Sequence, residues 1–500
     1  MTAPENERDL FELSIAECGA GLRSGTLTSV GLVESALDRI VTLDHKVCSF
    51  LHVDGERALR EAAEADRALA AGKDLGPLHG VPYALKDIFD VEGMPTTCHS
   101  KLMTDHVPKE NSGVQDRLRA GGAVCLGKLS THEFALGGPS FELPFPPARN
   151  PWNTDHFTGA SSSGSGAAVA AGFVRMAVGS DTSGSIRGPA YHCGVVGLKP
   201  TYGLVSRRGA YPLSYSLDHC GPIARSVEDA ALAMNVLAGF DPRDPSSVRN
   251  PVADHTAGLG LGVSGLRVAF STDWYGRRTE TDPEVADAVE RAVHVLASRG
   301  AEVTEVDLPD YDLLNACGRV IMTAESFAIH EDGLRTRGAD YGRYTYQRIM
   351  PGVGLTAADL LQAYRLRAEL AQDMHRKVFQ QHDVLVTAAG LTTAPALKDF
   401  PEDWPPPAPL TAMQTIPFNV TGHPAVTVPA GPAANGLPLG VQLAGRPFQE
   451  PVLLRAAREL ERFLPDMGLP AGFSSTDAVT GPVPSSETGT APYAPGPGGS

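Results

Sequence analysis

Residues 159–187 read GASSSGSGAAVAAGFVRMAVGSDTSGSIR, and the rest of the chain is organised around this stretch. Two loops rich in glycine and serine, 159–166 and 179–187, flank an apolar run at 167–178 that has the composition of a short helix. Glycine and serine let a backbone approach closely and adopt conformations that are closed to larger side chains. Successive unpaired backbone N–H groups in such a loop can point at one negatively charged oxygen. We therefore hypothesise that the segment holds the nucleophile and the oxyanion site of a hydrolase.

Runs of glycine and serine are most often flexible linkers, and composition alone favours that interpretation. Two features oppose it. The run at 167–178 is apolar and expects burial, and residues 193–198 (CGVVGL) indicate another buried element just downstream. Because a linker does not lie between two core segments, we interpret both loops as parts of a folded site.

The composition bounds the class of protein. With 500 residues, of which 42% are hydrophobic, the chain can bury a large core in one or two domains. Its net charge is −16, from 42 basic and 58 acidic residues, and no basic run stands out. This argues against direct contact with nucleic acid, although a tRNA-handling partner chain stays possible. No apolar run approaches the roughly 20 residues of a membrane span.

The seven cysteines are odd in number and scattered, and the polar N-terminus lacks the pattern of a signal peptide. Both features are typical of reduced thiols, so we expect a cytoplasmic protein. No C-x-x-C pair and no H-E-x-x-H pair occurs, so we expect no metal and no other cofactor.

Strand-like and helix-like segments alternate, which predicts an α/β domain with a largely parallel or mixed sheet. We expect a helical arm at 1–75, a core at 76–240, the remainder of the domain at 241–465 and a disordered low-complexity tail at 474–500. Loop and turn are expected at 199–226. Strands are predicted at 78–88, 123–127, 266–270, 302–306, 384–386, 426–428 and 440–443. Residues 8–72 are expected to be helical, and further helices are expected at 114–118, 227–237, 283–299, 318–334, 357–380 and 451–463.

A serine nucleophile needs a base, and histidine is the usual one. His132, His156, His192 and His219 lie near the two loops, but a lone histidine is more often structural, and no G-x-S-x-G elbow occurs. The loops also lack a Rossmann fingerprint and a Walker lysine. That leaves Lys86, at the end of an apolar strand, where burial would lower its pKa and keep the amine neutral. A surface lysine at a strand end is the commoner case, and composition does not decide between the two.

Eight short motifs together resemble the amidase signature family, and the resemblance covers about residues 8–465. It implies a single large α/β domain with a central twisted mixed β-sheet flanked by helices. The motifs are 80–87 (GVPYALKD), 159–165 (GASSSGS), 181–187 (DTSGSIR), 193–201 (CGVVGLKPT), 216–222 (SLDHCGP), 226–230 (SVEDA), 422–425 (GHPA) and 437–442 (LPLGVQ).

In this family a Ser–cis-Ser–Lys triad hydrolyses amides through an acyl-enzyme. The resemblance assigns Ser185 as the nucleophile, Ser161 as the bridging serine and Lys86 as the base, and it implies a cis peptide bond in the loop around Ser161. Ala160, Ser163 and Ser183 stand where glycines are usual, but serine and alanine are small, so we expect the loop geometry to survive. The backbone N–H groups expected to hold the oxyanion belong to Thr182, Ser183, Gly184 and Ser185.

Several substrates fit the resemblance. The branch that serves as the glutamine-hydrolysing A subunit of a tRNA-dependent amidotransferase usually has an aspartate where the alignment places Ala412, while Arg348 aligns loosely with its carboxylate-binding arginine. We therefore favour a stand-alone amidase acting on small aryl or alkyl amides, with esters and carbamates as further candidates. The amidotransferase subunit stays an alternative, as does a non-catalytic relative that only binds amides.

Substrate specificity is expected to come from 310–410, the least family-like part of the chain. The main pocket candidates are Tyr341, Tyr344, Arg348 and Met350, although ordinary core and loop packing is the commoner explanation for any single one. The oligomeric state stays open, with a homodimer through the helical arm as one option. Further aromatic and apolar candidates are Tyr346, Ile349, Leu355 and Trp404.

Overall fold

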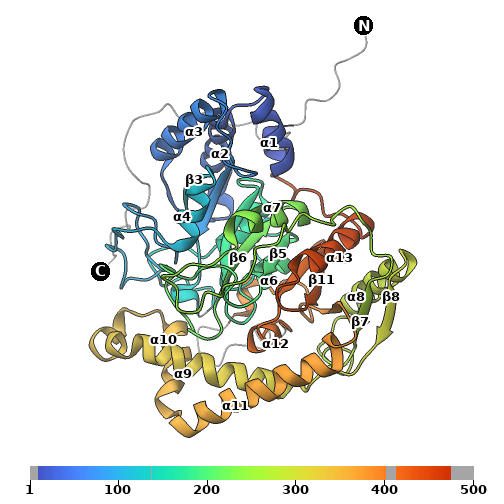
Figure 1. Cartoon of the computed structure of the whole chain (residues 1–500). Helices are drawn as coiled ribbons and strands as arrows, with labels where there is room; N and C mark the ends of the chain where they lie inside the picture. The colour runs from blue at the N-terminus through green and yellow to red at the C-terminus, as the bar shows by residue number, and fades with distance from the viewer. Residues whose placement is uncertain (1–8, 137, 401–412, 475–500) are drawn as a thin grey trace.

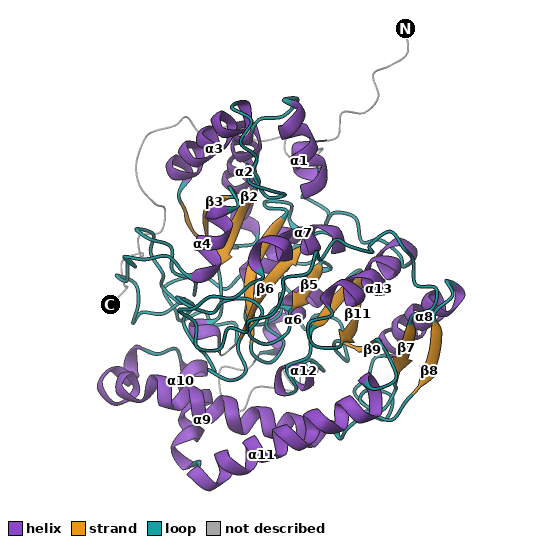
Figure 2. Cartoon of the chain, in the orientation of Figure 1, coloured by secondary structure: helices purple, strands orange, loops and turns teal. Residues whose placement is uncertain are grey.

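The structure is a computed structural model that describes residues 9–136, 138–400 and 413–474. These residues form one 11-stranded sheet with helices on both of its faces (Figure 1; Figure 2). The predicted single α/β domain with a mixed sheet is confirmed. Trp404, Ala412 and the predicted tail beyond residue 474 lie outside the described residues.

The strands are β1 (Phe50–Val53), β2 (Pro82–Lys86), β3 (Val124–Leu129), β4 (Met176–Asp181), β5 (Val196–Lys199), β6 (His219–Ala224), β7 (Arg267–Phe270), β8 (Glu302–Glu305), β9 (Val384–Ala388), β10 (Ala425–Pro432) and β11 (Pro438–Gly445). The helices are α1 (Ile15–Ser24), α2 (Ser29–Leu43), α3 (Gly55–Ala70), α4 (Gly113–Ala120), α5 (Ser163–Ala170), α6 (Arg187–Cys193), α7 (Val227–Leu237), α8 (Pro283–Ser298), α9 (Tyr311–Arg337), α10 (Arg343–Ile349), α11 (Ala357–Met374), α12 (Pro417–Val420) and α13 (Glu450–Phe463).

Across the sheet the strands are ordered β1-β3-β2-β4-β6-β5-β10-β11-β9-β7-β8. β2 is parallel to both β3 and β4, whereas the pairs from β4 to β9 through β6, β5, β10 and β11 are antiparallel. One sheet therefore takes strands from all three predicted parts of the chain. Because β2 and β4 are parallel neighbours, their carboxyl ends lie at the same edge of the sheet, and the loops that follow them meet there.

Two expectations about local structure are wrong. The segment 8–72 is not all helix, because β1 lies within it and pairs with β3. The segment 199–226 is not all loop, because β6 pairs with β4 along its whole length. β1 is too short for a periodic signal, and β6 contains Gly221 and Pro222, which are typical of turns. In both strands the pairing with distant partners decides the conformation.

The apolar run at 167–178 also divides differently from the expected short helix. α5 occupies its first part and β4 begins in its last part. Every residue of both elements is buried, so the run has no polar face whose spacing would distinguish helix from strand.

Two hydrophobic clusters cover the two faces of the β1–β6 half of the sheet. Ala177 belongs to a cluster with residues of α2, α3, α5 and α6, whereas its neighbours Met176 and Val178 belong to a cluster with residues of α1, α4, α7 and α13. Alternation along β4 places these clusters on opposite faces. The long helices α9 and α11 lie side by side as an outer layer, yellow and orange in Figure 1. Of the helices that the structure describes, none combines the length and apolar character needed to cross a membrane.

Candidate active site

Lys86 ends β2 and is fully buried. Its Nζ donates to Ser161 Oγ at 2.7 Å and to Ser180 Oγ at 2.8 Å. Ser161 follows the cis peptide bond Ala160–Ser161, which confirms the expectation of a cis bond in this loop. The sequence analysis did not single out Ser180, the last-but-one residue of β4 and part of the second serine-rich loop. The structure thus brings the candidate base and the candidate bridging serine into direct contact.

Burial lowers the pKa of Lys86 to about 7, although the charges of Asp218 and Asp181 act in the opposite direction. Near neutral pH a large share of this amine is therefore uncharged and able to accept a proton. Two other lysines in the described residues are equally buried and differ from it. Lys128 Nζ forms an ion pair with Asp87 at 2.8 Å, and Lys199 Nζ donates to the carbonyl of Pro200 at 3.0 Å.

Ser185 lies in the turn between β4 and α6, with 6% of its surface exposed. No hydrogen-bond partner for its hydroxyl is present among the described residues. The backbone N–H of Ser162 donates to the carbonyl of Ser185 at 3.3 Å, and so joins the two serine-rich loops. The predicted nucleophile is therefore on a loop that contacts the loop of Ser161, with its hydroxyl unused.

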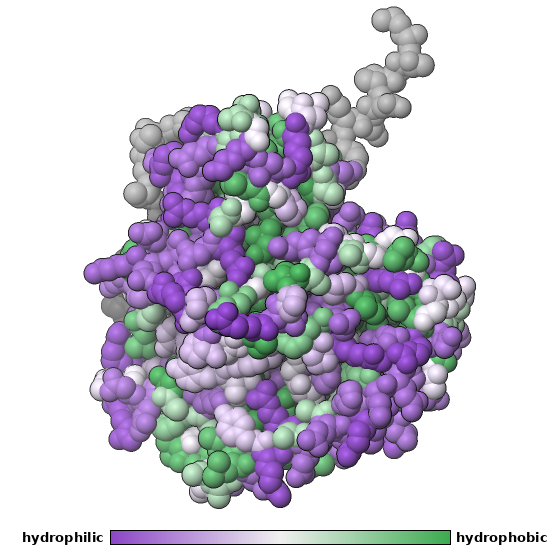
Figure 3. Space-filling model, viewed as in Figure 1, coloured by the Kyte–Doolittle hydropathy of each residue, from purple (hydrophilic) through white to green (hydrophobic). Residues whose placement is uncertain are grey.

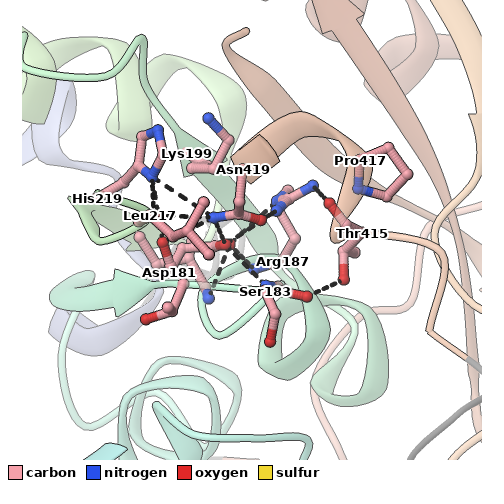
Figure 4. Close-up of polar contacts among 12 residues, drawn as sticks. Asp181, Ser183, Arg187, Lys199, Leu217, His219, Thr415, Pro417 and Asn419 are labelled. Carbon is pink, nitrogen blue, oxygen red and sulfur yellow. Dashed lines mark hydrogen bonds and ion pairs between the residues drawn. The ribbon is translucent and has the colours of Figure 1, made fainter. Parts of the chain in front are cut away.

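Asp181 and Arg187 form a fully buried ion pair that shapes the turn around Ser185, with Nη2 and Oδ1 2.9 Å apart (Figure 4). The carboxylate also accepts from the backbone N–H groups of Gly184 at 2.8 Å and Ile186 at 3.1 Å. Burial would raise the pKa of Asp181, but the charge and hydrogen bonds of Arg187, with a hydrogen bond from Asn419, hold it far below its usual range. At Arg187, Nη1 donates to Thr415 O at 2.8 Å and Gln442 Oε1 at 2.7 Å, and Nη2 to Asn419 Oδ1 at 2.7 Å.

Gly184 has no room for a side chain. Its φ is +128°, and an added Cβ would lie 2.0 Å from Thr415 Oγ1, which itself donates to Ser183 O at 2.6 Å. Ala160, Ser163 and Ser183, which replace family glycines, do not have positive φ. The loop can therefore hold its shape without glycine at those three positions.

Of the four predicted oxyanion donors, Gly184 uses its N–H on Asp181. The N–H groups of Thr182, Ser183 and Ser185 have no hydrogen-bond partner within the described chain. The side chain of Thr182 points elsewhere, because its Oγ1 donates to Asp218 Oδ1 at 2.6 Å. Three of the four predicted donors are thus unused within the described chain.

The histidines near the loops contact the scaffold. His219 Nδ1 lies 2.7 Å from Leu217 O, and burial, reinforced by Lys199, holds its pKa well below the usual range. Burial also lowers the pKa of His192 to about 3. His132 stacks on Phe157 with ring centroids 5.6 Å apart.

A cavity of about 710 Å³ reaches Ser180, the second acceptor of the Lys86 amine. It is lined by side chains of the segment 207–218 and by Ile88, Ala135, Tyr202 and Cys220, among others. The predicted pocket residues Tyr341, Tyr344, Arg348 and Met350 are not among its described lining residues.

The four predicted pocket residues lie in or beside α10. Tyr341 packs against Phe134, with ring centroids 5.7 Å apart, and its hydroxyl is 3.0 Å from His330 Nδ1. Tyr344 is buried and Met350 is half-buried. Burial and the neighbouring charge of Arg319 lower the pKa of Arg348 to about 10.

Sequence reasoning missed most of the residues that hold the site together. Asp181 and Arg187 stand in the quoted motif 181–187, but nothing in their spacing reveals an ion pair. Thr415, Asn419 and Gln442 lie more than two hundred residues downstream. Gln442 ends the quoted motif 437–442, but nothing in that motif indicates that it contacts Arg187.

Comparisons with known proteins identify the family of the chain. The Amidase family model matches residues 31–454. The A subunit of glutamyl-tRNA(Gln) amidotransferase from Geobacter sp. (strain M21) is 39% identical over 477 residues, 91% of this chain and 98% of that protein. A solved chain of the vestigial protein complex that reveals the evolutionary origins of an s-triazine catabolic enzyme is 36% identical, with a TM-score of 0.85, over 91% of this chain and 100% of that chain. Peptide amidase from Stenotrophomonas maltophilia is 30% identical, with a TM-score of 0.79, over 92% and 98%. This chain therefore belongs to the Amidase family of amide C–N hydrolases.

Proposed function

We propose that the chain cleaves its amide substrate through an acyl-enzyme on Ser185, with Ser161 as the proton relay and Lys86 as the base. The observation that carries the proposal is the 2.7 Å hydrogen bond between a fully buried lysine amine and the Ser161 hydroxyl. A buried amine with a pKa of about 7 is matched to proton transfer near neutral pH.

The reaction proceeds in two halves. Neutral Lys86 takes the proton of Ser161 as Ser161 takes that of Ser185, and the Ser185 oxygen attacks the amide carbonyl. The N–H groups of Thr182, Ser183 and Ser185 stabilise the oxyanion, since each such donor is worth about 3–4 kcal/mol in the transition state. Ser161 then protonates the departing amine and Lys86 returns a proton to Ser161. A water molecule then gives a proton to the relay as its oxygen attacks the acyl carbonyl. The ester bond to Ser185 breaks, the relay returns that proton to the Ser185 oxygen, and the acid is released.

The substrate class has two candidates. The first is a small aryl or alkyl amide, with carbamates and esters passing through the same acyl-enzyme. The second is glutamine, hydrolysed by this chain as the A subunit of a tRNA-dependent amidotransferase with partner chains. Relatives of that second kind are 39% identical over 91% of this chain, which favours glutamine. Ala412, where that branch usually has an aspartate for the amino group, favours the first.

A substrate panel tests the proposal. We expect the purified chain to hydrolyse at least one of glutamine, an anilide, an aliphatic amide and a carbamate, and Ser185→Ala to lower kcat by about 10⁴-fold or more. Ser163→Ala is the matched control, because that buried hydroxyl lies in the first serine-rich loop but outside the relay. Full turnover by Ser185→Ala would remove Ser185 as nucleophile. If glutamine is the only member of the panel that is hydrolysed, with release of ammonia, the result would favour the amidotransferase role. Partner chains that co-purify with this chain would support the same conclusion.

A further inference from the structure

The cavity beside Ser180 is aromatic and lies against the proton relay. Its lining includes the buried residues Ser180 and Cys220, and Ser180 Oγ is 2.8 Å from the amine of Lys86. Tyr202, Tyr211 and Tyr215 line it together with Pro212 and Leu213. At about 710 Å³ it has the size of sites that take a drug-sized group.

The proposed mechanism determines which half of a substrate faces this cavity. Ser161 hands its proton to the departing amine, so the amine lies on the side of Ser161 and Lys86, while the oxyanion lies beside Thr182, Ser183 and Ser185. Ser180 lines the cavity and shares the Lys86 amine with Ser161, whereas Lys86, Ser161 and Ser185 are not among the described lining residues. From this shared amine we infer that the cavity lies on the amine side. The inference therefore rests on the proposed function and concerns the amine half of the substrate.

Arg207 supplies a cation to the cavity wall. Its guanidinium lies 4.9 Å from the centre of the Tyr202 ring, Nε donates to Ser246 Oγ at 2.9 Å, and Nη1 donates to backbone carbonyls of Tyr215 and Asp218. Nη2 has no acceptor among the described residues, and no described carboxylate lies within 4.0 Å of the guanidinium. A stacked arginine with an unused pair of donors is a ready partner for a carboxylate.

The other charged groups of the cavity are already engaged. Asp218 accepts from Thr182 Oγ1 and from two backbone N–H groups, and Asp244 accepts from the backbone N–H of Arg207 and from Ser246. Arg208 pairs with Asp116 and Asp241, and Arg243 pairs with Glu110. Arg207 is thus the cation of this wall that is left for a ligand.

We propose that this cavity binds the amine half of the substrate, and that this half is an aromatic amine bearing a carboxylate. The tyrosines stack on the ring, and Arg207 Nη2 binds the carboxylate. A primary amide such as glutamine releases ammonia and leaves the cavity unfilled, so the inference separates the two substrate classes. Hydrolysis of such an anilide breaks the C–N bond, transfers the acyl group through Ser185 to water and releases an aminobenzoate.

Three substrates with one acyl group test the inference: propionamide, propionanilide and 4-(propionylamino)benzoate. We expect kcat/KM for the carboxylated anilide to exceed that of propionanilide by about tenfold or more, the usual gain from a charge-assisted hydrogen bond. Arg207→Gln should abolish this preference, while Arg335→Gln, which removes a positive charge from an exposed helix pair, should keep it. An equal kcat/KM for the two anilides in the wild-type protein would overturn the inference.

Calorimetric titration with 4-aminobenzoate and with aniline makes the test independent of turnover and of the variant's folding. We expect the wild-type protein to bind 4-aminobenzoate about tenfold or more tightly than aniline, and the difference to shrink as salt is added. If no amide in the panel is hydrolysed, the proposed function fails even where this preference is found. If amides are hydrolysed and aniline binds as well as 4-aminobenzoate, the amine-half inference fails alone.

Discussion

The Asp181–Arg187 pair and the Lys86 amine are both withdrawn from water beside the same strand, yet they are built in opposite ways. Asp181 is charged, and each of its oxygens accepts several hydrogen bonds, so the polar groups of this pair are satisfied within the protein (Figure 4). Lys86 faces two neutral hydroxyls and has no carboxylate within ion-pair distance in the described chain. Arg187 and the hydrogen bonds therefore keep Asp181 ionised in spite of burial, whereas burial lowers the pKa of Lys86 so that much of its amine is neutral near pH 7 and can accept a proton.

The hydrogen-bond partners of a buried charged group indicate whether it supports the structure or takes part in the chemistry. A buried ion pair with all partners in place holds a loop, whereas a buried amine between hydroxyls can exchange protons. Lys128 is the internal control, because it is equally buried but bonded to Asp87. On the face shown in Figure 3, hydrophilic residues are widespread, with smaller hydrophobic areas among them.

Lys86→Met is the strongest way to break the comparison. Removing the base should lower kcat/KM by about 10³-fold, within the range of general base catalysis. The folded protein holds the pKa of Lys86 at about 7, below its unfolded value. The depressed pKa therefore costs stability at every pH below about 10, and at pH 7 folding releases on average about half a proton. Methionine removes that cost. We expect the free energy of unfolding to stay within about 1 kcal/mol or to rise.

Activity assays and urea unfolding of Lys86→Met check both halves of this expectation. Lys128→Met is the matched control for the amine, and it should destabilise the protein because it leaves Asp87 buried without its cation. Retained turnover in Lys86→Met would contradict the base assignment.

Asp181→Asn should give the opposite signature. It leaves the Arg187 guanidinium buried without a counter-charge, which costs about 3–5 kcal/mol of unfolding free energy. Activity should fall with it, because Gly184 and Ile186 lose a charged acceptor. Urea titration measures the effect, with Glu331→Gln in an exposed helix pair as the control that should change by less than about 0.5 kcal/mol. A stable, inactive Asp181→Asn would show that this pair acts in the chemistry and not as scaffold.

The sequence predicted the architecture and supplied three candidate catalytic side chains, but it did not reveal most of the residues that support them. Alternating strand and helix patterns predicted the mixed sheet, and the motifs placed Lys86, Ser161 and Ser185. The strands β1 and β6 were not predicted, because β1 is only four residues long and β6 contains glycine and proline. The contacts of Thr415 and Asn419 with Arg187 were not predicted, because more than two hundred residues of sequence separate them from Arg187.

The predicted pocket at 310–410 shows another limit of sequence reasoning. Aromatic residues there suggested a lining, but aromatic composition alone does not reveal which ring faces the relay. In the structure Tyr341 packs against Phe134 and is not among the described lining residues of the cavity beside Ser180. Tyr211, from the segment 199–226 that was expected to be loop and turn, does line that cavity. The role of Tyr341, Tyr344, Arg348 and Met350 in substrate binding stays a prediction.

The pH dependence of the wild-type enzyme sharpens the comparison without a mutation. With a Lys86 pKa of about 7, the neutral amine is the reactive form, so kcat/KM should fall about tenfold for each pH unit below 6. Asp181 stays ionised across that range and contributes no inflection. Measuring kcat/KM from pH 5 to 9, with circular dichroism at each pH to follow folding, tests this. A flat profile from pH 9 to 5 in folded protein would exclude a titrating amine as base.

Thr415→Val should have the smallest effect, because it removes one hydrogen bond from the scaffold and leaves its charges intact. The Thr415 hydroxyl donates to Ser183 O at 2.6 Å, and so holds the peptide group between two oxyanion donors. Its loss should lower kcat by about threefold to tenfold, about 1 kcal/mol, with little change in KM, since the ground-state amide makes the weaker contact with those donors. Thr415→Ser keeps the hydroxyl and should recover kcat. If valine and serine lower kcat alike, packing of the lost methyl or the added bulk beside Gly184 is responsible, and Thr415 is not a positioning residue.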